Sequence, residues 1–270
     1  MDFYSELEIA LFSADINTKE LIVNRAITDC LRAQEQECNF EPKVQENPSY
    51  SEICKIVKPK DLPKRKDFNS KDGLIALVHS ITHIEFSAID LAIDAVYRFP
   101  NMPTDYKLDW LIVAQDEIRH FRMLLEILNK LGAEYGDLPV HKGLFEVSYK
   151  TNHSIIERMA VIPRYFEASG LDVNPKITAK LQNFKNNPIV AELLEALDII
   201  YDEEIDHVRK GDIWFKYLCD IENSDYQDRY LEIINKYRLH RDANNFDIEG
   251  RKKAGFSCSE LIALGAKECS

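Results

Sequence analysis

Two short segments of the sequence repeat one pair of metal-binding residue types at the same spacing. DEIRH contains Glu117 and His120, and EEIDH contains Glu204 and His207. Residues three apart lie on one face of an α-helix, so each carboxylate and its imidazole can reach the same ion. Iron and manganese accept carboxylate oxygen and imidazole nitrogen together. The repeated pair therefore predicts two halves of one metal centre.

The apolar residues around these pairs indicate that both face a helical core. In each segment, apolar residues recur at three- and four-residue steps, and the glutamate and histidine interrupt that stripe. Glu85 interrupts a third stripe in the same way. Buried carboxylates are costly without a compensating charge, and several together repel one another. A pair of divalent cations would supply the missing charge.

A fourth helix offers two candidate carboxylates. Glu167 follows the spacing set by the other helix pair, whereas Glu157 breaks this quasi-symmetry. The closeness of Glu167 to Gly170 argues the other way, because glycine often ends a helix. Glu167 is therefore the preferred ligand, with Glu157 as the alternative. The predicted ligands are Glu85, Glu117, His120, Glu167, Glu204 and His207.

Four charged residues beside the repeated pairs are predicted to support the ligands. They are Asp116, Glu203, Arg119 and Asp206. Asp116 and Glu203 are each expected to accept the free ring N–H of the ligand histidine on the other helix, which would fix its tautomer. Arg119 and Asp206 are expected to pair between the two helices. Ordinary surface charge is the alternative for all four.

Other histidines and the cysteines fit no metal site. His79 and His83 are one turn apart, but the 3.6-residue period turns them well away from Glu85, so we expect them to be packing or second-layer residues. The six cysteines contain no C-x-x-C pair. They are predicted to be reduced thiols of a cytoplasmic protein, because no signal peptide and no run of 18 apolar residues is seen.

Long helices are needed to position the candidate ligands. Helical periodicity predicts them over residues 70–99, 104–131, 144–169 and 188–220, with a separate short helix after Gly170. A short first link and longer later links are typical of a four-helix bundle with a crossover. The predicted fold class is all-α. Its predicted parts are N-terminal helices and an extended segment over 1–69, the bundle over 70–220, and a C-terminal helical extension over 221–270.

The charge balance disfavours partners that carry many phosphates. Lysine and arginine total 34 against 46 aspartates and glutamates, which gives a formal net charge of −12. The basic stretch over residues 55–66 contains prolines and no aromatic residue, so we interpret it as a solvated linker. Nucleic acid is therefore not expected as a partner, and the lack of a run of 18 apolar residues argues against a membrane.

Several segments carry a resemblance to known families. DEIRH resembles the D-E-x-R-H signature of bacterial di-iron monooxygenases in the ferritin-like superfamily. LIALVHSITHIEFSAIDLAIDAVYRFP, AQDEIRHFRML, MAVIPRYFEASGLDVNP, DEEIDHVRKGDIWF and NNFDIEGRKKAGFS resemble an uncharacterised bacterial ferritin-like family, domain of unknown function 455, over about residues 55–260. This resemblance implies a ferritin-like bundle and a di-metal centre, and it implies no substrate. YFEASG is also similar to a third-helix stretch of a tRNA-modifying di-iron hydroxylase, which implies Glu167 as a ligand, although Ser169 replaces that family's arginine.

These features together predict an oxidative enzyme. Two iron ions, with manganese or a mixed pair as alternatives, would activate O2 or peroxide to oxidise a small organic substrate, and the sequence names no electron donor. Hydroxylation of tRNA, non-catalytic iron binding or detoxification, and a metal-free interaction module are the alternatives. Tyr201 and Tyr165 are close in sequence to the ligands, but ordinary core packing is the favoured role of each.

Overall fold

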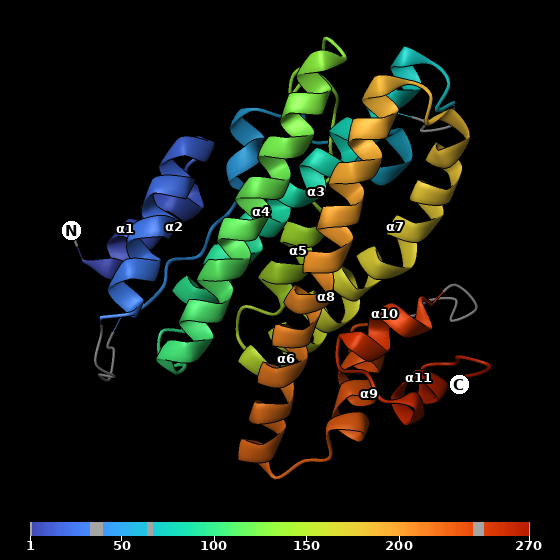
Figure 1. Ribbon diagram of the computed structural model, residues 1–270. Coiled ribbons are helices and arrows are strands. Elements are labelled where there is room, and N and C mark those ends of the chain that lie inside the picture. Colours follow the sequence, from blue (N-terminus) through green and yellow to red (C-terminus); the bar gives the residue numbers. More distant parts are fainter. Residues whose placement is uncertain (1, 33–39, 64–66, 240–245, 270) are drawn as a thin grey trace. The chain divides into compact units, whose positions relative to one another are not determined.

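The chain is all-helical, as the sequence predicts (Figure 1). The computed structural model describes residues 2–32, 40–63, 67–239 and 246–269. Within those ranges no strand is present, and the one extended pairing is an isolated bridge between Ile56 and Val140. The basic stretch 55–66 contains Ile56 of this bridge and one short 3-10 helix, η2 (Pro59–Asp61), and its residues 64–66 lie outside the described ranges.

Contacts group the chain into two compact units. Unit 1 comprises Met1–Phe145 and Asn186–Ala196, and unit 2 comprises Glu146–Lys185 and Leu197–Ser270. The long helix α8 (Pro188–Glu222) therefore contributes its first residues to unit 1 and the rest to unit 2. The division into 1–69, 70–220 and 221–270 stays a prediction.

Unit 1 is built around two long helices. Its elements are α1 (Phe3–Phe12), α2 (Ile16–Cys30), η1 (Ser49–Glu52), η2 (Pro59–Asp61), α3 (Lys71–Arg98) and α4 (Thr104–Lys130). α3 packs along α4, and α2 lies against α4 on the other side (Figure 1). The Ser70 side chain caps α3 by accepting the Gly73 N–H, and Gly132, with a φ of 77°, follows the end of α4. These local signals explain why both helices end within a residue of the predicted bounds.

Helix α3 is long and apolar enough to cross a membrane by length and composition alone. Its most apolar window has a mean hydropathy of 1.4, yet 78% of that window is buried inside the protein. The core helix of a folded domain has the same character.

A buried ion pair ties α2 to α3. The ammonium group of Lys19 contacts the Asp90 carboxylate at 2.5 Å and donates to the Ala10 carbonyl at 2.7 Å. Ser49 donates a hydrogen bond of 2.6 Å to the other oxygen of Asp90. The Lys19 side chain is fully buried, and these partners compensate its charge.

Two histidines of α3 hold the segment that follows α4. The Nε2 atom of His79 accepts the Gly136 N–H at 3.1 Å and the Leu138 N–H at 3.3 Å. His83 contacts the Tyr135 hydroxyl through Nδ1 at 3.0 Å and the His141 carbonyl through Nε2 at 2.8 Å. The predicted packing role of this pair is confirmed by these contacts.

His83 makes the stability of the fold depend on pH. Burial lowers the pKa of His83 from 6.5 to about 4, which outweighs its hydrogen bond to the His141 carbonyl. The unfolded chain therefore binds this proton first as pH falls, so stability is complete above about pH 6.5 and is lost towards pH 4. The loss from this group is at most about 3 kcal/mol. Urea unfolding across this pH range should show a shallower dependence for His83→Gln, and an identical slope would contradict this assignment.

Unit 2 contains the remaining helices, and two of the predicted helices in it are wrong. Its elements are most of α5 (Gly143–Lys150), α6 (Ile155–Val161), the π-helix η3 (Ile162–Glu167), α7 (Ala168–Leu181), η4 (Gln182–Phe184), most of α8, α9 (Tyr226–Lys236), α10 (Ile248–Lys253) and α11 (Cys258–Ala263). The predicted single helix over 144–169 is wrong. It breaks at residues 151–154 and then continues through Gly170 to Leu181, so the predicted separate short helix is also wrong.

Local chemistry explains both differences. Ser154 starts a new helix by accepting the Glu157 N–H, which separates α6 from α5. Pro163 has no N–H to donate, and it lies at the start of the π-helical turns of η3. A glycine ends a helix chiefly where it takes up a positive φ. Gly170 has no positive φ, and its backbone continues the helix.

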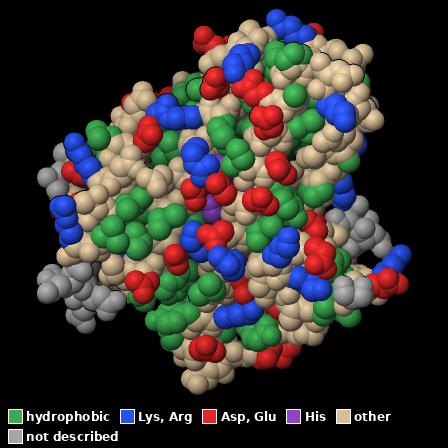
Figure 2. Space-filling view, viewed as in Figure 1, with side chains coloured by type: hydrophobic (Ala, Val, Ile, Leu, Met, Phe, Trp, Pro, Cys, Tyr) green, Lys and Arg blue, Asp and Glu red, His purple; other side chains and the backbone are tan. Residues whose placement is uncertain are grey.

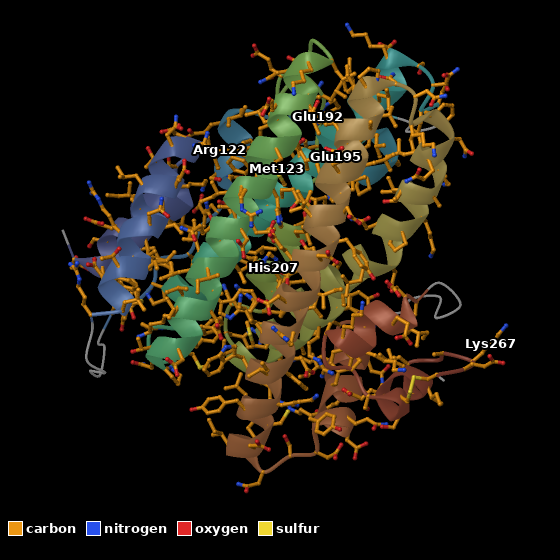
Figure 3. The ribbon with its side chains drawn as sticks, viewed as in Figure 1. Arg122, Met123, Glu192, Glu195, His207 and Lys267 are labelled. Atoms are coloured by element: carbon orange, nitrogen blue, oxygen red, sulfur yellow. A yellow bond between two sulfur atoms is a disulfide. The ribbon has the colours of Figure 1, made fainter. Side chains whose placement is uncertain are left out.

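The C-terminal part of unit 2 contains a disulfide bond that the sequence prediction did not include. Cys258, the first residue of α11, is bonded to Cys269, and the yellow bond in Figure 3 marks this link near the segment that carries Lys267. The prediction that all six cysteines are reduced is therefore wrong for this pair. Cys30, Cys54 and Cys219 are buried thiols. The cytoplasmic location stays a prediction.

Candidate metal centre

Unit 1 brings three predicted ligands together. Glu85 comes from α3, and Glu117 and His120 come from consecutive turns of α4. The Nδ1 atom of His120 lies 3.5 Å from the Glu85 carboxylate and 3.4 Å from the Glu117 carboxylate. Each of the three offers a ligand atom within 4.8 Å of the other two, and all three are buried. Two helices thus present two carboxylates and one imidazole to the same point.

The electrostatics of this group call for a cation. The pKa of Glu85 is raised to about 7, first by burial and then by the neighbouring charge of Glu117, against the opposing effect of His120. Burial alone would lower the pKa of His120, but the carboxylates of Glu117 and Glu85 raise it well above its usual value. Protons are thus held where two negative charges are forced together. A metal ion could take their place.

Unit 2 holds the second repeated pair on α8. The Nδ1 atom of His207 lies 4.0 Å from the Glu204 carboxylate. His207, labelled on α8 in Figure 3, is fully buried, and Glu204 is mostly buried. Leu193, Leu197 and Ile200 precede them as buried residues of the same stripe, as the sequence predicts.

Two contacts fix how η3 and α7 lie against α8. The Asn174 side chain donates to the Leu197 carbonyl at 2.9 Å. Further along, a Cβ added to Gly211 would lie 2.2 Å from the ring of Pro163, so the two helices are in close contact there. Residue numbers thus increase in opposite directions along the two helices, which are therefore antiparallel. Glu167 lies between these two points in sequence, so we expect it opposite the turn of α8 that carries Glu204 and His207.

The alternative ligand, Glu157, is engaged elsewhere. It lies on α6, before η3, and the same antiparallel pairing moves it along α8 away from Glu204. Lys236 contacts one Glu157 oxygen at 2.5 Å, and the Tyr237 hydroxyl donates to the other. Burial would raise the pKa of Glu157, but these two partners lower it on balance. Glu157 therefore anchors α9.

The contact at Gly211 makes a specific prediction. Gly211→Ala adds a methyl group that must displace the ring of Pro163, and that ring is fixed to the backbone. Overpacking of this kind costs about 1–3 kcal/mol, against a gain in helix propensity of about 1 kcal/mol. Gly170→Ala is the matched control, because nothing lies within 4 Å of its added Cβ. Urea unfolding should show Gly211→Ala destabilised and Gly170→Ala unchanged or stabilised, and equal stabilities would refute the close contact.

Three of the four flanking charged residues, Asp116, Arg119 and Asp206, form contacts along their own helices. Arg119 pairs with Asp116 at 2.8 Å on α4. On α8, Asp206 pairs with Arg209 and, at 2.7 Å, with Lys210. The predicted pairing of Arg119 with Asp206, and the supporting roles of Asp116 and Glu203, stay predictions.

One charged residue of this region was missed by the sequence interpretation. Arg164 lies in η3, three residues before Glu167, and is fully buried. The signal was present in MAVIPRYF, where a single cation interrupts an apolar run. Tyr201 has a defined role as well, because its hydroxyl donates a hydrogen bond to Asp247.

The donor set suits a metal ion of intermediate hardness. The unit 1 group supplies two carboxylates and one imidazole, and the candidate residues of unit 2 are likewise two glutamates and one histidine. Oxygen and imidazole donors without thiolate suit iron, manganese or zinc rather than copper(I) or an iron–sulfur cluster. The fold and these residues thus define an all-helical protein with a candidate carboxylate–histidine metal site.

Comparison with known proteins places the chain in a family. It belongs to the family described as "Protein of unknown function (DUF455)", whose sequence model matches residues 12–262. A relative from Haemophilus influenzae, described as an uncharacterized protein, is 36% identical over 271 residues, which cover 96% of this chain and 92% of the relative. No solved structure matches the chain.

Proposed function

We propose that this protein is a non-haem di-metal carboxylate protein, and that two iron ions are its working metals. The buried group of Glu85, Glu117 and His120 carries this proposal, because its carboxylates repel each other unless a proton or a cation intervenes. We propose that Glu204 joins this group, and that His207 and Glu167 complete the ligand set. The helices would then form a ferritin-like four-helix bundle.

The repeated arrangement supports a centre for two ions. Each half consists of one glutamate from one helix and a Glu-x-x-His pair from the next, as in ferritin-like di-iron proteins. Six ligands of this kind leave coordination positions open on both metals. Two iron ions held this way would supply the oxidation of an organic substrate by O2 or peroxide.

The residues of the chain would perform three tasks in such a reaction. Glu85 and Glu117 would compensate the metal charge, and they must lose any shared proton when metal binds. His120 would present a neutral nitrogen, so its proton must also leave. The apolar residues that flank these ligands on α3 and α4 would exclude bulk water, because they are buried along the length of both helices.

Hydroxylation of tRNA is a less favoured proposal. The resemblance of YFEASG to a tRNA-modifying hydroxylase motivates it, but the net charge of −12 opposes phosphate binding. Figure 2 shows basic and acidic side chains interspersed on the visible face, without an extended basic area. A small organic substrate is therefore the better proposal.

Metal analysis followed by exposure to oxygen tests the proposal. Protein purified without chelator should contain iron or manganese, and anaerobic addition of ferrous iron should load two ions per chain. Exposure of the loaded protein to O2 should then change its visible absorbance and its Mössbauer spectrum. Oxidation of added iron without any coupled substrate oxidation would favour iron binding or detoxification. A chain that holds no metal under any of these conditions would refute the proposal and favour an interaction module.

A further inference from the structure

Arg164 is enclosed by three aromatic rings in unit 2. Its guanidinium carbon lies 4.3 Å from the ring centre of Tyr230, and 4.7 Å from those of Phe215 and Phe256. An arginine stacks well on aromatic faces, because its planar cation is attracted to the π electrons. The side chain is fully buried, so it cannot leave this enclosure without a large rearrangement.

Two buried carboxylates compensate the charge of Arg164. Its Nη2 atom lies 3.1 Å from Asp212 of α8 and 2.5 Å from Glu260 of α11. Asp212 also contacts Lys216 at 2.8 Å, so Glu260 is the partner most dependent on Arg164. The removal of either carboxylate would leave the buried cation poorly compensated.

Glu260 is itself held by the local structure of α11. Its second oxygen accepts the Ser257 N–H at 2.9 Å, and the Ser257 hydroxyl accepts the Glu260 N–H, so the two form a capping box. The disulfide between Cys258 and Cys269 closes the same segment. Glu260 therefore presents its free oxygen to Arg164 from a fixed helix start.

The backbone of Arg164 is held by the same part of the chain. The Tyr230 hydroxyl of α9 donates to the Arg164 carbonyl at 2.9 Å. Arg164 belongs to the π-helical segment Ile162–Glu167, and π-helical turns are rare and frequently occur at functional sites. Residues of α8, α9 and α11 contact Arg164 and so hold this segment in place.

We propose that Arg164 is a positioning residue for Glu167, and that Glu260 of the disulfide-closed helix α11 holds Arg164 in place. This inference rests on the proposed metal centre, because the task of Glu167 is to bind metal. The C-terminal segments 226–236 and 256–269 would then contribute to metal affinity without contacting the ions.

Titration of the full-length chain with cobalt(II) tests this inference, because the visible absorption band of cobalt(II) reports its ligands. Arg164→Lys keeps the charge but loses the planar fork, and Glu260→Gln keeps the shape but loses the charge. Each should weaken one of the two bound ions by roughly 10- to 100-fold and change the visible band of that ion. A role confined to stability would lower the Tm and leave the band of the folded protein unchanged.

Lys236→Met provides the matched control. It removes the ion pair of another C-terminal helix with Glu157 and does not touch Arg164. Its affinities and visible bands should equal those of the unaltered protein. If Arg164→Lys fails to fold by circular dichroism, Glu260→Gln decides alone.

The outcomes distinguish failure of the proposed metal centre from failure of the positioning role of Arg164. An unaltered chain that binds no cobalt(II) would overturn the proposed centre and this inference with it. If the unaltered chain binds two ions, and Glu260→Gln binds them with the same affinity and the same spectrum, the positioning role is refuted while the proposed centre stands.

Discussion

Glu167→Ala is expected to reduce the metal content of the iron-loaded protein from two ions to one, whereas Glu157→Ala leaves both ions bound. The antiparallel pairing of η3 and α7 with α8 brings Glu167 opposite Glu204 and His207. Loss of a carboxylate ligand removes both a donor atom and a negative charge. The affinity for one ion should then be too low for that ion to stay bound during gel filtration. Elemental analysis after anaerobic loading and gel filtration measures the stoichiometry directly.

Glu157→Ala controls for the loss of an acidic side chain from the same part of the chain. It should lower the stability of the protein, because Lys236 and Tyr237 lose their partner, but it should not change the number of bound ions. Loss of metal with Glu157→Ala and full loading with Glu167→Ala would mean that the third-helix ligand has been chosen wrongly.

Lys19→Met is expected to destabilise the protein by about 3–5 kcal/mol, because it leaves Asp90 buried without its cation. Lys19 is fully buried and contacts Asp90 at 2.5 Å. Burial raises the pKa of Asp90, and the charge of Lys19 opposes that rise. In the variant, Asp90 should become protonated more readily, so part of the lost stability should return as pH falls. Urea unfolding at neutral and acidic pH measures both effects.

Lys43→Met is the matched control for a surface ion pair. Lys43 contacts Glu8 at 2.6 Å, but its side chain is 71% exposed. Exposed pairs contribute at most about 1 kcal/mol, so this variant should unfold close to the unaltered protein. Equal losses for the two lysine variants would show that burial does not set the strength of the Lys19–Asp90 pair.

Local sequence signals predicted the helices of unit 1 well. Ser70 caps α3, and Gly132 follows α4 with a positive φ, so propensity, capping and burial agree along this part of the chain. The bounds of α8 were predicted to within two residues for a similar reason, since its helical periodicity runs along its whole length. Where local helix preference and packing agree, a single sequence is sufficient to predict the bounds of a helix.

The third long helix could not be predicted as it is. Its periodicity was interpreted with a constant 3.6 residues per turn, but the π-helical turns of Ile162–Glu167 change that phase. Residues before and after η3 therefore do not continue one stripe. Gly170 has no positive φ and lies inside the helix. The presence of a glycine in the sequence does not show whether it ends a helix or continues one.

The surroundings of Arg164 depend on contacts between distant parts of the sequence. Phe215, Tyr230 and Phe256 come from three different segments, and only the folded chain brings their rings together. The lone arginine in MAVIPRYF was a usable signal, but its partners could not be deduced from spacing. The candidate metal ligands of the two repeated pairs were easier to predict from the sequence, because each pair lies within one turn of a helix.

The disulfide between Cys258 and Cys269 has a practical consequence for the handling of this protein. A sample kept with a dithiol reductant and a sample kept without one differ covalently in the segment that carries Glu260. Metal titrations on the two samples will agree only if the support of Arg164 survives the opening of that loop. The choice of purification buffer is therefore an experimental variable, and both samples should be compared before any metal affinity is assigned to the protein.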